Sequence, residues 1–333
     1  MKSKFIVFTL ILLISIIGCK KNENITAPNS GQCEWKIVRN ADSSYYFLGM
    51  CFPDQMNGWA VGYSGIILHT SDAGNSWIKL ESVTPNAFQC VYFYNSQKGW
   101  IGAASGAIGM TIDGGKSWTW QYFVDKSNRT FMSISFVNEL TGWITDNFGG
   151  ILHTEDGGMS WTPQISGTTY AITAVQFLSA QIGWAVATNR IILHTTDGGN
   201  NWKTQILDSL TYSYFVVYTD IFFNNSSHGW VATNALFNNS PSPTASVVCS
   251  SDSGRIWNYQ PTPVDMISSI YFANSTSGWA AARRGILHTT DGGSTWNYQL
   301  TIPSGPFIKL CFVDQLHGWA ITYSGAIYRF QIW

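Results

Sequence analysis

Charge is scarce in this sequence: Asp, Glu, Lys and Arg together make up 11% of the 333 residues, and the formal net charge is −1. A chain so close to neutral lacks the basic surface that nucleic acids attract, so we expect no nucleic-acid partner. Disorder over most of the chain is also excluded, because 45% of the residues are hydrophobic and 15% are aromatic. Most of the chain must therefore pack into a core.

Long hydrophobic runs are absent except at the start of the chain. Two lysines precede the apolar run 5–17, which is too short to span a bilayer comfortably. The run ends in Ile-Ile-Gly-Cys, which resembles a bacterial lipobox and implies that residues 1–18 are a signal peptide and that Cys19 is acylated. An ordinary signal peptide or an uncleaved anchor is the alternative. Residues 19–32 are polar and predict a tether, and Lys20 in place of Asp favours the outer membrane of a cell envelope.

Cysteine supplies neither a metal site nor a complete set of disulfides. Five cysteines follow Cys19, and an odd number cannot all pair within one exported chain. No two of them have the spacing of metal ligands, and three fall on the repeat positions described next, where a thiol acts as a small apolar filler. We expect no metal and no cofactor.

A repeated Gly-Trp pair dominates the rest of the chain. The spacings between successive copies are 41, 43, 41, 46, 49 and 40 residues, which is the length of one four-stranded propeller blade. The seven tryptophans are Trp59, Trp100, Trp143, Trp184, Trp230, Trp279 and Trp319.

A phenylalanine stands six residues before the glycine of every Gly-Trp pair, and another apolar residue stands two positions before that phenylalanine. Alternating apolar positions are typical of a strand with one face in a core, so this segment is the predicted inner strand, A. A polar turn follows, and Gly-Trp begins strand B. The seven phenylalanines are Phe52, Phe93, Phe136, Phe177, Phe223, Phe272 and Phe312.

A third apolar run, often Ile-Leu-His-Thr, predicts strand C and leads into a turn of the form Asp-x-Gly-x-x-Trp. Its glycines allow the positive φ values of a tight hairpin, and the Asp carboxylate can accept backbone N–H groups across the turn. The turn occurs six times, and its tryptophan begins strand D. The six turn aspartates are Asp72, Asp113, Asp156, Asp197, Asp252 and Asp291.

Six turns for seven Gly-Trp pairs indicate how the ring closes. Trp35 lies 17 residues before Phe52, within the spacing seen between a turn tryptophan and the next phenylalanine elsewhere. Residues 34–39 are therefore predicted to be strand D of the last blade, which removes a free sheet edge. Fourteen of the sixteen tryptophans then occupy repeat positions. The predicted fold is all-β: residues 33–333 form a single seven-bladed β-propeller of four-stranded antiparallel blades, the last closed by the N-terminal strand.

The Asp-x-Gly-x-x-Trp turns resemble the Asp-box, or bacterial neuraminidase (BNR) repeat. The longer pattern Phe…Gly-Trp-Ala-Val…His-Thr…Asp-Gly-Gly-x-x-Trp is similar to the photosystem II assembly/stability factor family of plants and cyanobacteria, over roughly residues 33–333. It departs in blade 5, which is longer, and in blade 7, where Arg329 replaces the recurrent His. The resemblance implies a non-catalytic propeller that binds protein, with a basic patch contacting a membrane-protein partner.

Repetition argues against chemistry at the histidines and the turn aspartates. One repeat position is occupied by His69, His153, His194 and His288, and in other blades by Met110, Cys249 and Arg329. A position that only lines the blade tolerates this exchange of residue types, whereas a metal site does not. An active site needs one constellation, so the six Asp-box aspartates are predicted to be structural. Sialidase chemistry is excluded because the chain lacks the arginine cluster and the Tyr–Glu nucleophile pair of those enzymes.

One carboxylate pair stays open as an alternative. Asp146, predicted in the B–C loop of blade 3, and Asp220, at the start of strand A of blade 5, could both face the mouth of the channel. A glycoside hydrolase uses such a pair, so carbohydrate binding or hydrolysis is the second functional hypothesis. Solvated loop acids are the simpler explanation.

The leading hypothesis places a protein partner on the face where the repeat breaks down. The D–A and B–C loops share this face, and two expansions occur there, 207–215 and 234–245. We expect a monomeric, lipid-anchored scaffold that assembles or stabilises an envelope complex. The candidate partner-binding residues are Arg129, Arg190, Arg283 and Arg284, with the loop aromatics Tyr212, Tyr214 and Phe237.

Overall fold

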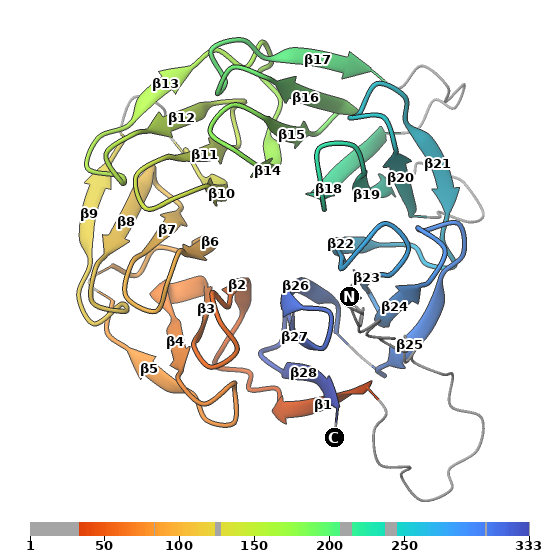
Figure 1. Cartoon of the computed structure of the whole chain (residues 1–333). Coiled ribbons are helices and arrows are strands. Elements are labelled where there is room, and N and C mark those ends of the chain that lie inside the picture. The colour runs from red at the N-terminus through yellow and green to blue at the C-terminus, as the bar shows by residue number, and fades with distance from the viewer. Residues whose placement is uncertain are drawn as a thin grey trace, which may run out of the picture.

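Seven four-stranded antiparallel sheets are arranged around a central channel, as predicted (Figure 1). The computed structural model describes residues 33–82, 84–123, 128–206, 215–236, 245–303 and 305–332. Within these ranges the one helical segment is the single 3-10 turn η1 (Tyr63–Gly65), and no helix there is long and apolar enough to cross a membrane.

Each blade is a meander whose strands A to D run outward from the channel. Blades 1 to 4 comprise β2 (Phe47–Cys51), β3 (Gly58–Gly62), β4 (Ile67–Thr70) and β5 (Ile78–Leu80); β6 (Phe88–Phe93), β7 (Gly99–Ala103), β8 (Ala107–Thr111) and β9 (Thr119–Tyr122); β10 (Phe131–Phe136), β11 (Gly142–Asp146), β12 (Ile151–Thr154) and β13 (Thr162–Gln164); and β14 (Ile172–Phe177), β15 (Gly183–Ala187), β16 (Ile191–Thr195) and β17 (Lys203–Ile206). Blades 5 to 7 comprise β18 (Phe215–Phe223), β19 (Gly229–Leu236), β20 (Ser246–Ser250) and β21 (Asn258–Pro261); β22 (Ile267–Phe272), β23 (Gly278–Ala282), β24 (Gly285–Thr289) and β25 (Asn297–Thr301); and β26 (Phe307–Asp314), β27 (His317–Thr322), β28 (Ile327–Ile332) and β1 (Cys33–Arg39).

The ring closes through blade 7, which contains both ends of the described chain. Strand β1 pairs antiparallel with β28, from Cys33 opposite Ile332 to Arg39 opposite Ile327. The Trp35 ring is 7% exposed and packs on Phe330, with ring centroids 5.2 Å apart. The predicted closure by the N-terminal strand is confirmed.

The Phe and Gly-Trp repeat positions hold adjacent blades together. Phe177 stacks on Trp143 of the preceding blade, with centroids 3.4 Å apart and an angle of 4° between the rings. Its other face covers Gly183, where an added Cβ would lie 2.5 Å from the ring. Glycine is therefore required here for space and not for an unusual φ. Burial of the Trp143 indole removes about 200 Å² of its surface from water. At about 25 cal/mol per Å², this burial stabilises the folded chain by about 5 kcal/mol.

Strand A of every blade carries a β-bulge. The register with strand B shifts by one residue, for instance between Ile172 and Ala174 in β14. A bulge interrupts the regular alternation of side chains between the two faces of the strand. The side chain of the extra residue here faces the neighbouring blade or the channel. Where that residue has a hydroxyl, it links two blades: Thr173 Oγ1 donates to the carbonyl of Tyr218 at 2.7 Å. The seven bulged residues are Leu48, Gln89, Met132, Thr173, Thr219, Ser268 and Ile308.

Candidate functional site

The two faces of the ring differ sharply in charge. The A–B and C–D turns form one face, here called the Asp-box face, and the B–C and D–A loops form the other, the loop face. Among the described residues, the turns of the Asp-box face carry ten acids (Asp54, Asp72, Asp113, Glu139, Glu155, Asp156, Asp197, Asp252, Asp291 and Asp314) against Lys98, Lys116 and Arg255. The described loop face carries Asp42, Glu81, Asp146 and Asp265 against Arg39, Arg129, Arg190, Arg283 and Arg284. Five of the seven arginines therefore lie on the loop face, where the described bases exceed the acids by one, whereas on the described Asp-box face the acids exceed the bases by seven.

The Asp-box carboxylates are occupied by their own turns. Asp156 Oδ1 accepts the Ser160 N–H at 2.9 Å, and Oδ2 accepts the Ser160 hydroxyl at 2.6 Å. The hydroxyl of Thr154 donates to Asp156 and accepts the Gly158 N–H. These hydrogen bonds lower the pKa of Asp156 to about 2, and the bond from the Ser160 hydroxyl has the largest effect.

The same turns also receive hydrogen bonds from the preceding blade. The Trp143 indole donates to the carbonyl of Gly198 at 3.1 Å, and the Trp100 indole donates to Gly157 at 2.9 Å. An Asp-box thus shapes a hairpin and presents an acceptor to the neighbouring blade. The contacts described for Asp156 are those of a turn-forming side chain, as predicted for the Asp-box aspartates.

The recurrent histidines lie against tryptophan rings and not in the channel. His153 stacks on Trp143 with centroids 4.7 Å apart, on strand C of its blade. Burial lowers the pKa of His288 to about 4, so its imidazole is neutral near pH 7. Arg329 occupies the same slot in blade 7, above Trp319. In the described part of the chain no group of three His, Cys, Asp or Glu side chains is placed to hold a metal ion.

The central channel holds a cavity of about 720 Å³ lined by strand A of all seven blades. The residue that follows the bulge is small in five blades: Gly49, Cys90, Ser133 and Ala174, which line the cavity, and Ser269. Blades 5 and 7 differ, because Asp220 and Lys309 stand there, and these are the charged residues among the cavity's lining.

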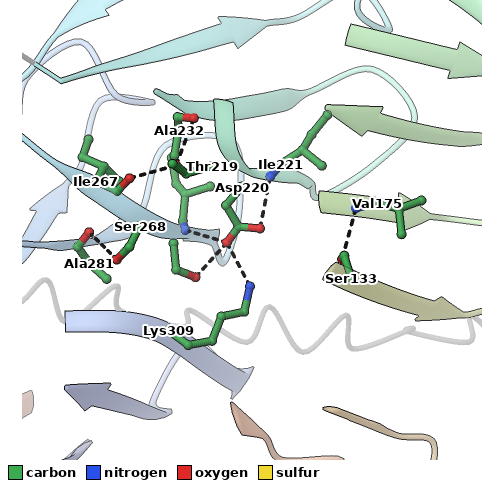
Figure 2. Close-up of polar contacts among 12 residues, drawn as sticks. Ser133, Val175, Thr219, Asp220, Ile221, Ala232, Ile267, Ser268, Ala281 and Lys309 are labelled. Carbon is green, nitrogen blue, oxygen red and sulfur yellow. Dashed lines mark hydrogen bonds and ion pairs between the residues drawn. The ribbon is translucent and has the colours of Figure 1, made fainter. Parts of the chain in front are cut away.

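Asp220 binds groups from two other blades (Figure 2). Its Oδ2 accepts the Ser269 hydroxyl at 2.7 Å and the Ile270 N–H at 3.1 Å, both from β22. The Lys309 ammonium of β26 donates to the same oxygen at 3.1 Å. The Asp220 side chain is 11% exposed and that of Lys309 is 38% exposed. One carboxylate thus ties together blades 5, 6 and 7.

Asp146 does not join Asp220, so the structure does not assemble the alternative carboxylate pair. It is the last residue of β11, 1% exposed, and its Oδ1 accepts the N–H groups of Phe148 and Gly150 at 2.7 Å each. The Arg129 side chain lies 3.4 Å from its Oδ2. This group borders a separate hollow on the loop face of blade 3, not the channel.

The four candidate arginines differ in what they present. Arg129 is 5% exposed and pairs with Asp146, so it belongs to the packing of blade 3 and offers little surface to a partner. Arg190 is half-buried in a tight B–C turn with a φ of +62°. Arg283 and Arg284 are exposed on the B–C loop of blade 6, and Arg283 forms an exposed ion pair with Asp265 at 3.0 Å.

Part of the predicted loop expansion in blade 5 is sheet. Strands β18 and β19 are nine and eight residues long, and residues 215–217 pair with 234–236 beyond the usual length of a blade strand. The prediction that 234–236 belong to a loop is wrong, because the hydrogen-bonded ladder of this hairpin continues to Leu236. Tyr212, Tyr214 and Phe237, like Cys19, the predicted site of lipidation, lie outside the described residues.

Sequence reasoning missed a cluster of three exposed tyrosines on the loop face. Tyr46, Tyr63 and Tyr323 are 43%, 45% and 37% exposed. The Tyr323 ring lies 5.3 Å from that of Tyr46 and 6.3 Å, edge-on, from that of Tyr63. A signal was present, since Tyr-Ser-Gly occurs at 63–65 and again at 323–325, the B–C turns of the first and last blades.

Comparison with known proteins agrees with this fold. Residues 79–175 match a family model described as photosynthesis system II assembly factor YCF48. No curated protein sequence matches the chain significantly.

Solved structures of two such factors superpose on nearly the whole ring. YCF48 bound to D1 peptide has a TM-score of 0.71 and 20% identity, covering 89% of this chain and 96% of its own. YCF48 from Cyanidioschyzon merolae has a TM-score of 0.71 and 19% identity, covering 90% and 99%. The GH74 enzyme of Niastella koreensis has a TM-score of 0.66 and 14% identity, and the match covers 88% of this chain but 53% of the enzyme. The resemblance seen in the sequence is confirmed: the chain is a seven-bladed propeller similar to the photosystem II assembly factors.

Proposed function

We propose that this propeller is a non-catalytic scaffold that binds a segment of a protein partner on its loop face. The observation that carries this is the division of charge between the faces. The described Asp-box face has ten acids and three bases, whereas the described loop face has four acids and five arginines. Because two of the arginines, Arg283 and Arg284, are exposed, the loop face offers a cationic surface to an acidic segment.

A similar propeller supports the choice of a protein ligand. A YCF48 structure that covers 89% of this chain contains a D1 peptide, so the fold accommodates peptide recognition in that protein. The carboxylates also favour binding over catalysis. Asp146 and Asp220 are both buried and engaged by two or more donors, so neither is available as a general acid or nucleophile.

The place of the scaffold in the cell envelope follows from the lipobox. We assign residues 1–18 to a signal peptide, residues 19–32 to a tether, and the lipid to Cys19. Strand β1 begins at Cys33, opposite Ile332, at the end of blade 7 that belongs to the Asp-box face. A tether of this length spans about 45 Å when extended, so the ring can stand off the membrane with its loop face outward. The scaffold would then assemble or stabilise an envelope complex as a monomer.

Recovery of a partner from solubilised membranes tests the binding face. The wild-type protein should recover a protein that the triple variant Arg190→Glu, Arg283→Glu, Arg284→Glu recovers at least about tenfold less, because reversed charge repels an acidic segment. The matched control is Lys116→Glu with Arg255→Glu, which reverses two exposed cations on the Asp-box face. Equal recovery by the arginine variant, or equal loss in the control, overturns the assignment to the loop face. Mass spectrometry of Cys19 tests the anchor, and an unmodified thiol overturns it.

A further inference from the structure

The tyrosine cluster lies on a continuous band of loops across blades 6, 7 and 1. The Ile302 N–H donates to the carbonyl of Arg284, and the Tyr323 N–H donates to that of Pro306. These two bonds join the D–A loop between blades 6 and 7 to the B–C loops on either side of it. The arginines of blade 6 and the tyrosines of blade 7 therefore belong to one surface.

Two more hydrogen bonds carry the band across the closure of the ring. The Asp42 N–H donates to the carbonyl of Ser324, and the Tyr63 N–H donates to that of Tyr46, both at distances of 2.9 to 3.1 Å. The Arg39 guanidinium fastens the same junction, because it donates to the carbonyl of Gly325 and lies 4.8 Å from the centre of the Tyr45 ring. The loops that hold the three tyrosines are thus joined to one another by hydrogen bonds within the chain.

Three tyrosines, two of which contact the ring of Tyr323, are exposed here, whereas the Gly-Trp indoles of the repeat are buried. The Gly-Trp indoles are 0–2% exposed, and the cluster tyrosines are 37–45% exposed. Tyrosine and arginine are, together with tryptophan, the residues most enriched at the energetic centres of interfaces, and a rigid aromatic ring supplies large contact area at low entropic cost. A preorganised aromatic cluster beside exposed arginines has the composition of such a centre.

We infer that the cluster of Tyr46, Tyr63 and Tyr323 is the anchoring site for an extended acidic peptide segment of the protein partner. A proline or aromatic residue of that segment packs on the three rings, and its carboxylates lie toward Arg284 and Arg283. The acidic character follows from charge complementarity, since the described loop face is the cationic one. This inference rests on the proposed function and adds to it the site and the chemistry of the bound segment.

Selection from a library of random twelve-residue peptides displayed on phage tests the inference. The immobilised full chain should enrich peptides that contain Asp or Glu together with Pro or an aromatic residue. The winning peptide is then synthesised with a fluorophore, and its dissociation constant is measured by fluorescence anisotropy. The double variant Tyr63→Ser, Tyr323→Ser should weaken binding by about thirtyfold, as the truncation of interface hot spots does.

The matched control is Tyr170→Ser, which removes a tyrosine from a D–A loop on the same face. Tyr170 is 45% exposed, like Tyr63, and packs against no ring of the cluster. Binding by this control should match the wild type. Circular dichroism and the melting temperature of all variants should be unchanged, since the altered side chains are exposed.

Failure of the inference can be told apart from failure of the proposed function. Unchanged peptide affinity in the Tyr63→Ser, Tyr323→Ser variant, with a loss in the triple variant Arg190→Glu, Arg283→Glu, Arg284→Glu, overturns the tyrosine site and leaves the loop-face function standing. Enrichment of basic or wholly apolar peptides overturns the stated chemistry. A glycan array on which wild-type binding depends on the tyrosines, with no peptide enriched, overturns both, because the ligand is then a carbohydrate.

Discussion

Replacing Asp220 with Ala should destabilise the ring by about 3 kcal/mol, because its carboxylate joins three blades. The change removes the acceptor of the Ser269 hydroxyl, the Ile270 N–H and the Lys309 ammonium. The hydroxyl can rotate and the ammonium, at 38% exposure, can reach water, but the Ile270 amide is buried and loses the acceptor that Asp220 provides. A buried donor without a partner costs about 1–3 kcal/mol, and each lost charged hydrogen bond costs a further 1 kcal/mol or so after solvent compensation.

The control is an ion pair of the same length on the surface. Asp265 lies 3.0 Å from Arg283, against 3.1 Å between Asp220 and Lys309, but the side chains of this exposed pair are 46% and 54% accessible. Water and salt screen such a pair, so Asp265→Ala should cost about 0–1 kcal/mol. The two substitutions therefore separate the effect of burial from that of distance.

Urea unfolding followed by circular dichroism and by tryptophan fluorescence measures both costs. The two probes must give coincident transitions, since a ring of seven blades could otherwise unfold in parts. A midpoint for Asp220→Ala that lies no lower than that of Asp265→Ala would refute the reasoning, because burial would then not determine the strength of these contacts. The double variant with Lys309→Met should show a coupling of about 1–2 kcal/mol in a double-mutant cycle.

Other features of the ring make separate predictions. Gly183→Ala should cost about 1–3 kcal/mol in urea unfolding, because the new methyl group overlaps the ring of Phe177; an unchanged midpoint would show that the ring moves freely. The carboxylate of Asp156 should stabilise the fold above pH 3.8 and lose that effect as the pH falls towards 2, its pKa in the folded chain. In the variant Asp156→Ala the free energy of unfolding should therefore fall less between pH 3.8 and pH 2 than in the wild type. An identical pH dependence in the two proteins would contradict this. Trp35→Ala should lower stability by about 3–5 kcal/mol by loosening the closing strand, which differential scanning calorimetry can measure; a smaller loss than about 1 kcal/mol would count against closure through β1.

The candidate site was less predictable than the fold, and individual residues show why. The turn aspartates could be assigned from sequence because each acts within four residues of itself, as Asp156 does with Ser160. The partners of Asp220 could not, because Ser269, Ile270 and Lys309 belong to other blades, and neither could the pairing of Asp146 with Arg129, which lies on a different loop. The residue type alone does not show whether the carboxylate of an aspartate lies at the mouth of a channel or in a buried ion pair. Arg129 was for this reason expected on the surface and is found packed against Asp146.

The sequence by itself determined the ring: the number of blades, the strands of each, and the closing of the last blade by the first strand. It could do so because strand alternation and the Gly-Trp spacing are local patterns, and repetition of a local pattern sets the architecture. The tertiary structure alone decided which loop residues meet. Tyr63 and Tyr323 stand near opposite ends of the chain and touch only because the ring closes. The repeated Tyr-Ser-Gly marks their two turns in the sequence but does not show that the two side chains meet.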